Sequence, residues 1–443
     1  MRINEKKFFE LAKENGFEAA DLSYSHTTST SLSIFHGEID SFTEHDSYSL
    51  DARGIINGKF GAVTTEQFDK NTPQFLINSI KNTAKIIEKD EQGIIFKGSE
   101  KYHKKNLFNK AVAEINVSDA IKNCLEIEKK LLAFDKRINE VVTVGFVKEC
   151  SDNALSNSYG LKLKTKGATY AYFAEVTAKN GDEVRTGFKV FESIDLNEFN
   201  MDNFVKDVAA DALKRLGATQ CKSKKYPVVF DPSTASKLLK CFLGPIDAED
   251  VEKKSSYFVG KLNTQVASKK LTVVENGLAK NIFFTYFDDE GVAINKREII
   301  KKGELKTYLY TLETAKKAGV EPTGNASVSG GKSSARLHQI FVKPGRKSEE
   351  EIISGIKEGV YIDDLQGMHA GMNRTSGNFS LQANGFMIRD GKIAEPLALI
   401  TVADNLMNLF NNIKDVANNA KLITETASTC PSICIKKVSI TGK

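Results

Sequence analysis

A chain of 443 residues with 41% hydrophobic and 27% charged residues has the composition of an ordinary globular protein, which excludes intrinsic disorder. Its 62 basic and 57 acidic side chains leave a net charge of only +5, which argues against strong nucleic-acid binding. The N-terminal segment Met1–Phe9 lacks the apolar core of a signal peptide, and no apolar stretch is long enough to span a bilayer. The six cysteines are sparse, which fits a reducing compartment. We therefore expect a cytoplasmic protein with no membrane association and no strong nucleic-acid binding.

The first half of the chain alternates strand patterns with amphipathic helices. Apolar residues at helical spacing predict helices over residues 4–15, 73–90, 117–139 and 200–216. Alternating apolar and polar residues predict short strands near residues 18–26, 30–37, 39–44 and 48–53. Asn57-Gly58 predicts a hairpin that leads into a strand over residues 60–65, and residues 141–191 return to short strands.

The second half of the chain is richer in strands. It follows a basic stretch at Lys224–Tyr226, and its clearest helices are expected over residues 233–243, 348–358 and 404–416. The sequence therefore predicts an α+β fold of two domains. Residues 1–220 form an N-terminal domain with a mixed sheet and helices, and residues 221–443 form a strand-rich, mainly antiparallel C-terminal domain.

A zinc-hydrolase helix needs two histidines one turn apart with a glutamate beside the first. The six histidines of this chain provide no such pair on a predicted helix, and the dipeptide His-Glu does not occur. A zincin-type site is therefore absent from the sequence, and we predict no catalytic residue and no metal ligand.

Two other motifs resemble ligand sites. Gly331-Lys332-Ser333 could end a phosphate-binding loop, but the first glycine of that motif would fall on Ala326, so a flexible Gly/Ser-rich loop is the better interpretation. The carboxylates of Asp288–Glu290 could bind a hard cation, but they lack the alternating ligands of an EF-hand, and a tight acidic turn is favoured.

Cys430 and Cys434 are four residues apart, close to the C-terminus. On one strand they would lie about 13 Å apart, which is too far to share a metal ion. We predict two small buried hydrophobic residues, and Cys430, which precedes a proline, is the candidate reactive thiol of the pair.

The segment Gly367–Arg374 is the most suggestive of a binding site. Its histidine, His369, lies between glycines that allow a ligand to approach the backbone closely. Asn373 and Arg374 follow, and such polar side chains in a loop suit the binding of a peptide backbone or carboxylate. His369, Asn373 and Arg374 are therefore candidate peptide-binding residues, and a polar turn before a strand over residues 379–383 is the alternative.

Several stretches, in this order and spacing, resemble the PmbA (TldE) branch of the TldD/PmbA peptidase family over nearly the whole chain. They are Leu50–Gly54, Asn57–Gly61, Tyr226–Pro232, Ser256–Leu262, Phe287–Val292, Gly303–Leu309, Thr323–Ala326, Gly377–Ser380, Asn384–Phe386, Gly391–Ile393, Ile400–Leu406 and Ile440–Lys443. The resemblance implies two α+β domains, dimerisation and a role in degrading or maturing peptides. The family is also labelled a modulator of DNA gyrase.

The resemblance further implies which residues replace the zinc motif. TldD-type members carry a His-Glu-x-x-x-His helix and act as zinc peptidases, whereas PmbA-type members lack this motif and pair with TldD. Lys240 and Pro245 stand at the two histidine positions of this helix, and Cys241 stands at the glutamate position. Lysine is a cation and proline offers no ligand and ends the helix. Zinc is therefore expected on a TldD-type partner and no cofactor in this chain.

Three hypotheses follow. The favoured one is a subunit that is non-catalytic alone, pairs with a TldD-type zinc peptidase and helps to hold an unfolded peptide, with a homodimer as the alternative assembly. The second is a peptidase with an unrecognised active site, for which His369, Cys430 and Asp288–Glu290 are the candidates. The third is a binding module that acts on DNA gyrase or DNA, which the balanced charge disfavours.

Overall fold

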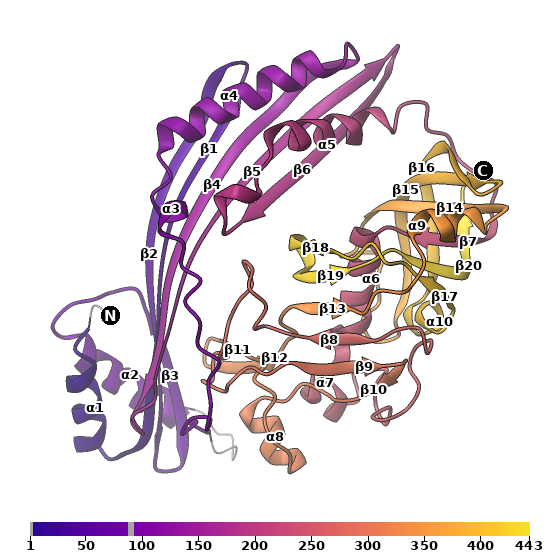
Figure 1. The fold of residues 1–443 in the computed structure, drawn as a ribbon. Helices are drawn as coiled ribbons and strands as arrows, with labels where there is room; N and C mark the ends of the chain where they lie inside the picture. The colour runs from indigo at the N-terminus through magenta and orange to yellow at the C-terminus, as the bar shows by residue number, and fades with distance from the viewer. Residues whose placement is uncertain (1–2, 87–92) are drawn as a thin grey trace.

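The computed structural model describes residues 3–86 and 93–443, and its N-terminal half is built on one long antiparallel sheet (Figure 1). The strand order is β3-β2-β1-β4-β5-β6. The strands are β1 Phe17–Phe35, β2 Glu38–Ile56, β3 Lys59–Thr65, β4 Ile138–Asn157, β5 Lys162–Asn180 and β6 Glu183–Ser193.

The strands of this sheet are longer than the sequence predicted. β1 and β2 have 19 residues each, so the short strands expected near residues 18–26, 30–37, 39–44 and 48–53 merge into two, and the predicted breaks were wrong. Residues 38–46 of β2 are exposed throughout, so their polar side chains mark a solvated part of the strand rather than a turn. The hairpin at Asn57-Gly58 is confirmed, because both residues have the positive φ that a tight turn between β2 and β3 requires.

Two groups of helices cover the ends of this sheet and enclose separate apolar cores. The helices of the N-terminal half are α1 Glu5–Glu14, α2 Thr72–Ile86, α3 Lys110–Ala113, α4 Val117–Phe134, η1 Leu196–Glu198 and α5 Met201–Leu213. The four predicted helices are confirmed, although α4 and α5 end earlier than expected and residues 87–90 of the second prediction lie outside the described residues. In Figure 1 the sheet forms an arch, with α1 and α2 at one end and α4 and α5 at the other.

The C-terminal half contains two six-stranded sheets and a hairpin. The first sheet has the order β16-β15-β14-β7-β20-β17, and it closes on itself because β16 also pairs with β20. Its strands are β7 Lys224–Phe230, β14 Glu358–Gln366, β15 Asn378–Arg389, β16 Lys392–Asn405, β17 Ile413–Val416 and β20 Ile433–Thr441. The second sheet and the hairpin contain β8 Val273–Glu275, β9 Arg297–Lys301, β10 Glu304–Leu305, β11 Ala326–Ser329, β12 Lys332–Ala335, β13 Ile340–Val342, β18 Lys421–Ile423 and β19 Ser428–Cys430.

The helices of this half are short, and most lie between strands. They are α6 Pro232–Leu243, η2 Gly244–Ile246, α7 Ala248–Glu252, α8 Leu312–Ala318, α9 Glu349–Ser354, α10 Leu406–Asn411 and η3 Thr424–Thr426. The helix predicted over residues 404–416 is only partly right, because residues 413–416 form β17. The two pairings β7–β14 and β13–β19 are parallel, and the other pairings between the described strands are antiparallel. The predicted α+β class is confirmed.

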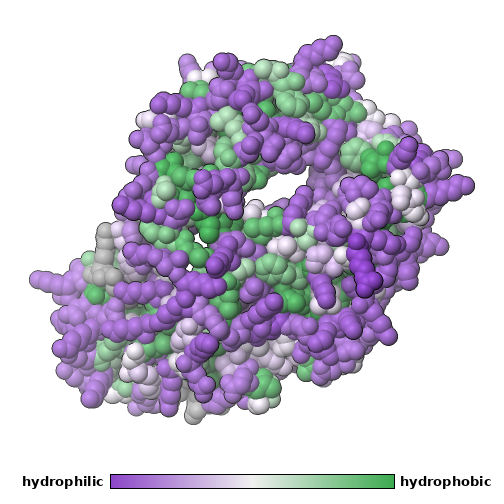
Figure 2. Space-filling view, in the orientation of Figure 1, coloured by the Kyte–Doolittle hydropathy of each residue, from purple (hydrophilic) through white to green (hydrophobic). Residues whose placement is uncertain are grey.

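The two halves touch at both ends of the arch. Near α2 and β3, the Arg53 guanidinium donates to the carbonyl oxygen of Asp289 (3.3 Å), and the Tyr102 hydroxyl donates to that of Gly291 (2.7 Å). Beyond α5, the Lys214 ammonium lies 2.6 Å from the Asp363 carboxylate. Figure 2 shows an opening through the molecule between these contacts.

None of the described helices combines the length and apolar character needed to cross a membrane.

Candidate functional site

Helix α6 begins with a partly buried cap. The Asp231 carboxylate accepts hydrogen bonds from the Thr234 backbone N–H and hydroxyl, both at 2.8 Å, and Pro232 occupies the first turn. Both features are typical of a helix N-terminus. The apolar face of α6, which includes Leu239 and Phe242, is completely buried in the largest core of the protein. The helix is therefore fixed in place, and the side chains of its last turn have defined neighbours.

The last turn of α6 carries two of the three positions predicted to replace a zinc motif, Lys240 and Cys241. Lys240 is exposed, and its ammonium donates to the carbonyl oxygen of Thr426 (3.1 Å). Partial burial, followed by the positive charge of Arg336, lowers the Lys240 pKa. Burial raises the pKa of the half-buried Cys241 thiol, although the charges of Arg374 and Lys240 oppose this effect.

Pro245 lies two residues beyond the end of α6 and is buried. Its carbonyl oxygen accepts a hydrogen bond from the Ser256 hydroxyl (2.6 Å), so it supports the turn that follows the helix. An ammonium, a thiol with a raised pKa and a proline do not fit a zinc ion, which prefers imidazole, thiolate and carboxylate ligands. Among the described residues, no group of three or more His, Cys, Asp and Glu side chains is placed to hold a metal ion.

The predicted binding loop follows β14 and reaches the surface. His369 and Arg374 are exposed, so both are accessible to a ligand. Asn373 instead organises the turn, because its side-chain oxygen accepts the N–H groups of Thr375 (3.1 Å) and Ser376 (2.9 Å). This hydrogen bonding corresponds to the polar turn that was the alternative for this segment, and it leaves the exposed His369 and Arg374 side chains available.

The structure brings this loop next to the last turn of α6. The Tyr257 hydroxyl donates to the carbonyl oxygen of Phe242 (2.6 Å), and a side chain at Gly377 would lie 3.2 Å from the Tyr257 ring. Tyr257 therefore joins the helix to the base of the loop. Arg374 acts electrostatically on Cys241, so two predictions that are more than a hundred residues apart in sequence describe one neighbourhood.

Sequence reasoning missed two residues of this neighbourhood. The positive charge of Arg336, which follows β12, helps to lower the Lys240 pKa, and Thr426 supplies the carbonyl oxygen that accepts the hydrogen bond of the Lys240 ammonium. Neither residue belongs to a recognisable motif. They lie about a hundred and two hundred residues away in the chain, so only the fold of the C-terminal half could reveal them.

Comparison with known proteins identifies the family of this chain. Three models of PmbA/TldA metallopeptidase domains match consecutive stretches: domain 1 over residues 20–89, the central domain over 110–218 and the C-terminal domain over 223–442. The chain belongs to the PmbA/TldD family. The predicted resemblance is thereby confirmed.

Relatives of this PmbA/TldD chain include the metalloprotease PmbA of Escherichia coli O157:H7, which is 25% identical over 429 residues, covering 96% of this chain and 93% of the relative. A Thermotoga maritima protein named as a modulator of a DNA gyrase has a solved structure with a TM-score of 0.91 and 28% identity, covering 99% of both chains. TldE from Thermococcus kodakarensis has a TM-score of 0.90 at 22% identity, covering 99% of this chain and 100% of that one, and shows the shared fold.

The family models divide the N-terminal half between residues 89 and 110. In this PmbA/TldD chain that division falls between β3 and β4 in sequence, yet β1 and β4 pair within one continuous sheet. The division into two domains at residues 220 and 221 stays a prediction.

The acidic segment Asp288–Glu290 of this family member is a structural turn. Asp288 is buried, and its carboxylate accepts the backbone N–H groups of Glu290, Val292 and Ala326 at 2.9–3.0 Å. Burial, followed by the negative charge of Glu290, raises the pKa of Asp288 to about 8. Because backbone groups occupy both carboxylate oxygens, the favoured interpretation as a tight acidic turn is confirmed.

The remaining motifs lie away from α6 or are inaccessible. Gly331-Lys332-Ser333 belongs to the β11–β12 hairpin rather than to the predicted flexible loop, because the positive φ angles of Gly330 and Gly331 form a tight turn. Cys430 and Cys434 are buried as predicted. Cys430 ends β19 and Cys434 lies on β20, and these two strands belong to different sheets.

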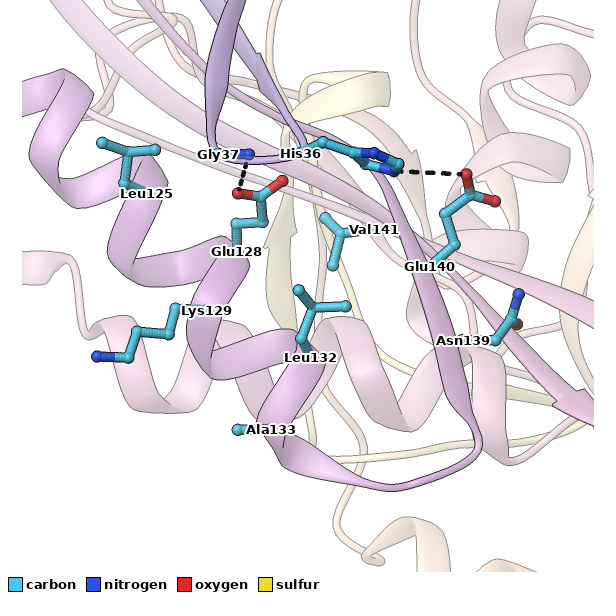
Figure 3. A pocket seen from close by; sticks show the side chains of 10 residues that line it. All are labelled: His36, Gly37, Leu125, Glu128, Lys129, Leu132, Ala133, Asn139, Glu140 and Val141. Atoms are coloured by element: carbon cyan, nitrogen blue, oxygen red, sulfur yellow. Dashed lines mark hydrogen bonds and ion pairs between the residues drawn. The ribbon is translucent and has the colours of Figure 1, made fainter.

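Two cavities lie outside this neighbourhood. One of about 1040 Å³ lies between the β1–β2 hairpin and α4 (Figure 3). There the Glu128 carboxylate accepts the Gly37 N–H (2.9 Å), so it stabilises the hairpin. The other, of about 1340 Å³, separates β6 and α5 from the C-terminal half. Its lining includes Asp231 at the start of α6 but not Lys240 or Arg374.

Proposed function

We propose that this chain is a PmbA/TldE-like subunit of a cytoplasmic TldD/TldE-type metallopeptidase system. In this proposal it has no hydrolytic centre of its own, and it pairs with a TldD-type subunit that carries the zinc ion. Together the two subunits degrade or mature unfolded peptides.

One observation carries the proposal. By the family resemblance, Lys240 and Cys241 at the end of α6 and Pro245 just beyond it stand where a catalytic family member needs its histidines and its glutamate. The Lys240 ammonium cannot donate a lone pair to zinc, and no carboxylate at position 241 can activate a water molecule. A chain with this helix needs a second subunit to cleave a peptide bond through zinc.

A reconstitution experiment tests the proposal. The purified chain, a TldD-type subunit and their equimolar mixture are each incubated with an unstructured peptide, and cleavage is followed by mass spectrometry. Zinc in each protein is measured by elemental analysis. We expect cleavage to be greatest in the mixture, with zinc on the TldD-type subunit and at most trace zinc on this chain.

The controls separate this proposal from an unrecognised active site. A TldD-type variant with its zinc-binding histidines replaced by alanine should abolish cleavage in the mixture. Cleavage by this chain alone, which persists in the presence of a chelator and is lost in His369→Ala, would contradict the proposal and support a peptidase site in the Gly367–Arg374 loop.

A further inference from the structure

The second strand of the arch has a long unpaired edge. β2 pairs with β1 along its whole length, but β3 pairs with it only over Leu50–Ile56 (Figure 1). Within residues 3–86 and 93–443, no strand lies beside Ser41–Ser49 on the side away from β1. Every second residue of this segment turns its backbone N–H and C=O toward that side. We call Ser41–Ser49 the open edge of the sheet.

The open edge lacks most of the features that keep sheet edges from pairing. It contains no lysine or proline, and its register with β1 is regular from Ser41 to Ser49. The register shifts at Asp40, where a bulge ends the regular segment near the hairpin. Residues 41–46 are all exposed, although they alternate between the two faces of the sheet. A long exposed edge without lysine, proline or bulges is a template for pairing with another chain.

The two faces of the open edge differ in chemistry. One face is small and polar, and consists of Ser41, Thr43, His45, Ser47 and Ser49. The other face combines aromatic rings with carboxylates, and consists of Phe42, Glu44, Asp46 and Tyr48. Phe42 is 47% exposed, so much of its ring is uncovered. A strand added to this edge would meet hydroxyl groups on one face, and an apolar ring beside two carboxylates on the other.

The charge of the open edge selects the kind of strand that fits it. The chain has no lysine or arginine between Lys13 and Arg53, although its net charge is +5. Asp46 lies 2.9 Å from His26, but in the described part of the chain no lysine or arginine forms an ion pair with Glu44 or Asp46. Opposite charges on facing residues of neighbouring strands stabilise a sheet, and like charges destabilise it. The edge therefore favours a strand with lysine or arginine on this face.

The same rule argues against a second copy of this chain as the occupant. If two open edges paired antiparallel along their full length, Ser41 of one copy would face Ser49 of the other. Glu44 would then face Asp46 of the second copy, and this contact between carboxylates would occur twice. A nucleic acid is disfavoured for the same reason, because its phosphates are anionic. The carboxylates thus prevent self-association and leave the edge open to a basic strand.

We propose that the open edge is a docking site for an extended basic segment of a partner protein. The segment adds a strand beside β2, and its backbone satisfies the N–H and C=O groups of the edge. Its lysine or arginine side chains face Glu44 and Asp46, and an apolar side chain packs on Phe42. The inference is independent of the proposed function, because no hydrolytic centre and no peptide cleavage enter into it.

A synthetic strand tests the docking site on the isolated chain. A short fluorescent peptide alternates threonine with lysine in one half and with valine in the other, so its lysines and valines share one face when it is extended. Fluorescence anisotropy gives its Kd. We expect this peptide to bind about tenfold more tightly than a version with glutamate in place of lysine, and the difference should shrink at high salt. Equal affinities of the two peptides would overturn the proposal.

N-methylation separates strand pairing from general charge attraction. Methyl groups on every second backbone nitrogen block one edge of the peptide, and two complementary versions block one edge each. A strand that pairs through a single edge predicts that one version keeps its affinity and the other loses binding. Equal binding by both versions, or loss of binding by both, would overturn the strand addition.

Matched variants test the assignment of residues. Glu44→Gln combined with Asp46→Asn should weaken binding of the lysine peptide about fivefold, because two exposed charge pairs are lost. Asp119→Asn combined with Glu126→Gln is the control, because it removes two exposed carboxylates from α4 and should leave the Kd unchanged. All four side chains are exposed, and unchanged circular dichroism would verify that both variants are folded. Equal weakening by the two double variants would overturn the assignment to the open edge.

A cysteine variant tests the other occupant, a second copy of this chain. His45→Cys places a thiol at the centre of the open edge, where two copies paired along their full length would bring the two thiols together. After mild oxidation, we expect no more disulfide-linked dimer than the wild type forms. Rapid cross-linking of His45→Cys would overturn the proposal, because a second copy would then occupy the edge.

Discussion

The cysteines differ sharply in accessibility, and burial determines which of them can react. Cys430 is fully buried, and burial followed by the negative charge of Asp231 raises its pKa strongly. Since the thiolate is the reactive form of cysteine, this environment disfavours the reaction of Cys430, and its reactivity stays a prediction to be tested. Cys241 and Cys150 are only partly buried, and these two are the accessible thiols among the six.

We therefore predict that a thiol reagent modifies two cysteines of the native protein slowly and all six after unfolding. Peptide mapping by mass spectrometry after a short iodoacetamide pulse should place the native label on Cys150 and Cys241. Cys241→Ser should remove one of the two sites and leave the other unchanged. Native labelling of Cys430 at a rate comparable to Cys241 would contradict the packing around α6.

Helix α6 shows how an element fixes the candidate site from its other end. The Asp231 cap lies at the end of α6 opposite to Lys240, and it helps to hold the whole helix against the closed sheet. The Asp231 backbone N–H donates to the carbonyl oxygen of Ile362 on β14 (3.0 Å). The cap, the helix and the strand that leads to the Gly367 loop are thereby joined in one hydrogen-bonded unit.

Removing this cap should destabilise the protein. We expect Asp231→Ala to lower the free energy of unfolding by about 1–2 kcal/mol, because two donors of Thr234 lose their acceptor. Asp231→Asn keeps a side-chain oxygen in the same place, so it should lower the free energy of unfolding by less than the alanine variant does. Urea unfolding followed by circular dichroism measures both. An asparagine variant as unstable as the alanine variant would show that the charge, rather than the cap, is what stabilises α6.

The elements were predictable from the sequence where local chemistry determines them. Helix periodicity and the Asn57-Gly58 turn gave correct elements, because the apolar face and the turn conformation depend on neighbouring residues. The length of β2 was not predictable, since its exposed residues 38–46 show no alternation and are held by pairing with β1. The helix positions of the candidate site could be located from the family resemblance. The roles of Arg336 and Thr426 could not be predicted, because both residues lie far from Lys240 in the chain and act on it only in the folded C-terminal half.

At the scale of the whole molecule, the arch and the C-terminal half are held together at two places. One is the buried Asp21–Arg53 pair, which reaches the Asp289 carbonyl. The other is a charge network beyond α5, where Lys214 lies 2.8 Å from the Asp211 carboxylate and 2.6 Å from that of Asp363. Separation of either contact would open the ring seen in Figure 2. The first contact ends on a neutral carbonyl oxygen, whereas the Lys214–Asp363 contact is ionic, so the second contact is the one expected to respond to pH.

Asp211 lies on the N-terminal side of this network, where it pairs with the same Lys214, and its pKa shows how the network depends on pH. Burial alone would raise its pKa, but the charges of Lys189 and Lys214 outweigh burial and lower it to about 2 from the usual 3.8. A carboxyl group whose pKa is lower in the folded state stabilises the protein above the unfolded pKa, and this contribution is lost as pH falls from about 4 to about 2. The shift corresponds to about 2 kcal/mol at neutral pH.

We therefore expect Asp211→Asn to lower the free energy of unfolding by about 2 kcal/mol at pH 7, measured by urea unfolding. The difference from the wild type should shrink steadily below pH 4, because the wild-type carboxylate becomes protonated and loses its attraction for Lys189 and Lys214. Asp207→Asn, one turn earlier on α5 and exposed, is the matched control and should change stability little at any pH. The contrary result is a difference in the free energy of unfolding between Asp211→Asn and the wild type that stays constant down to pH 2.5. That result would mean that the hydrogen bond from the Phe188 N–H, rather than charge, holds α5 against β6.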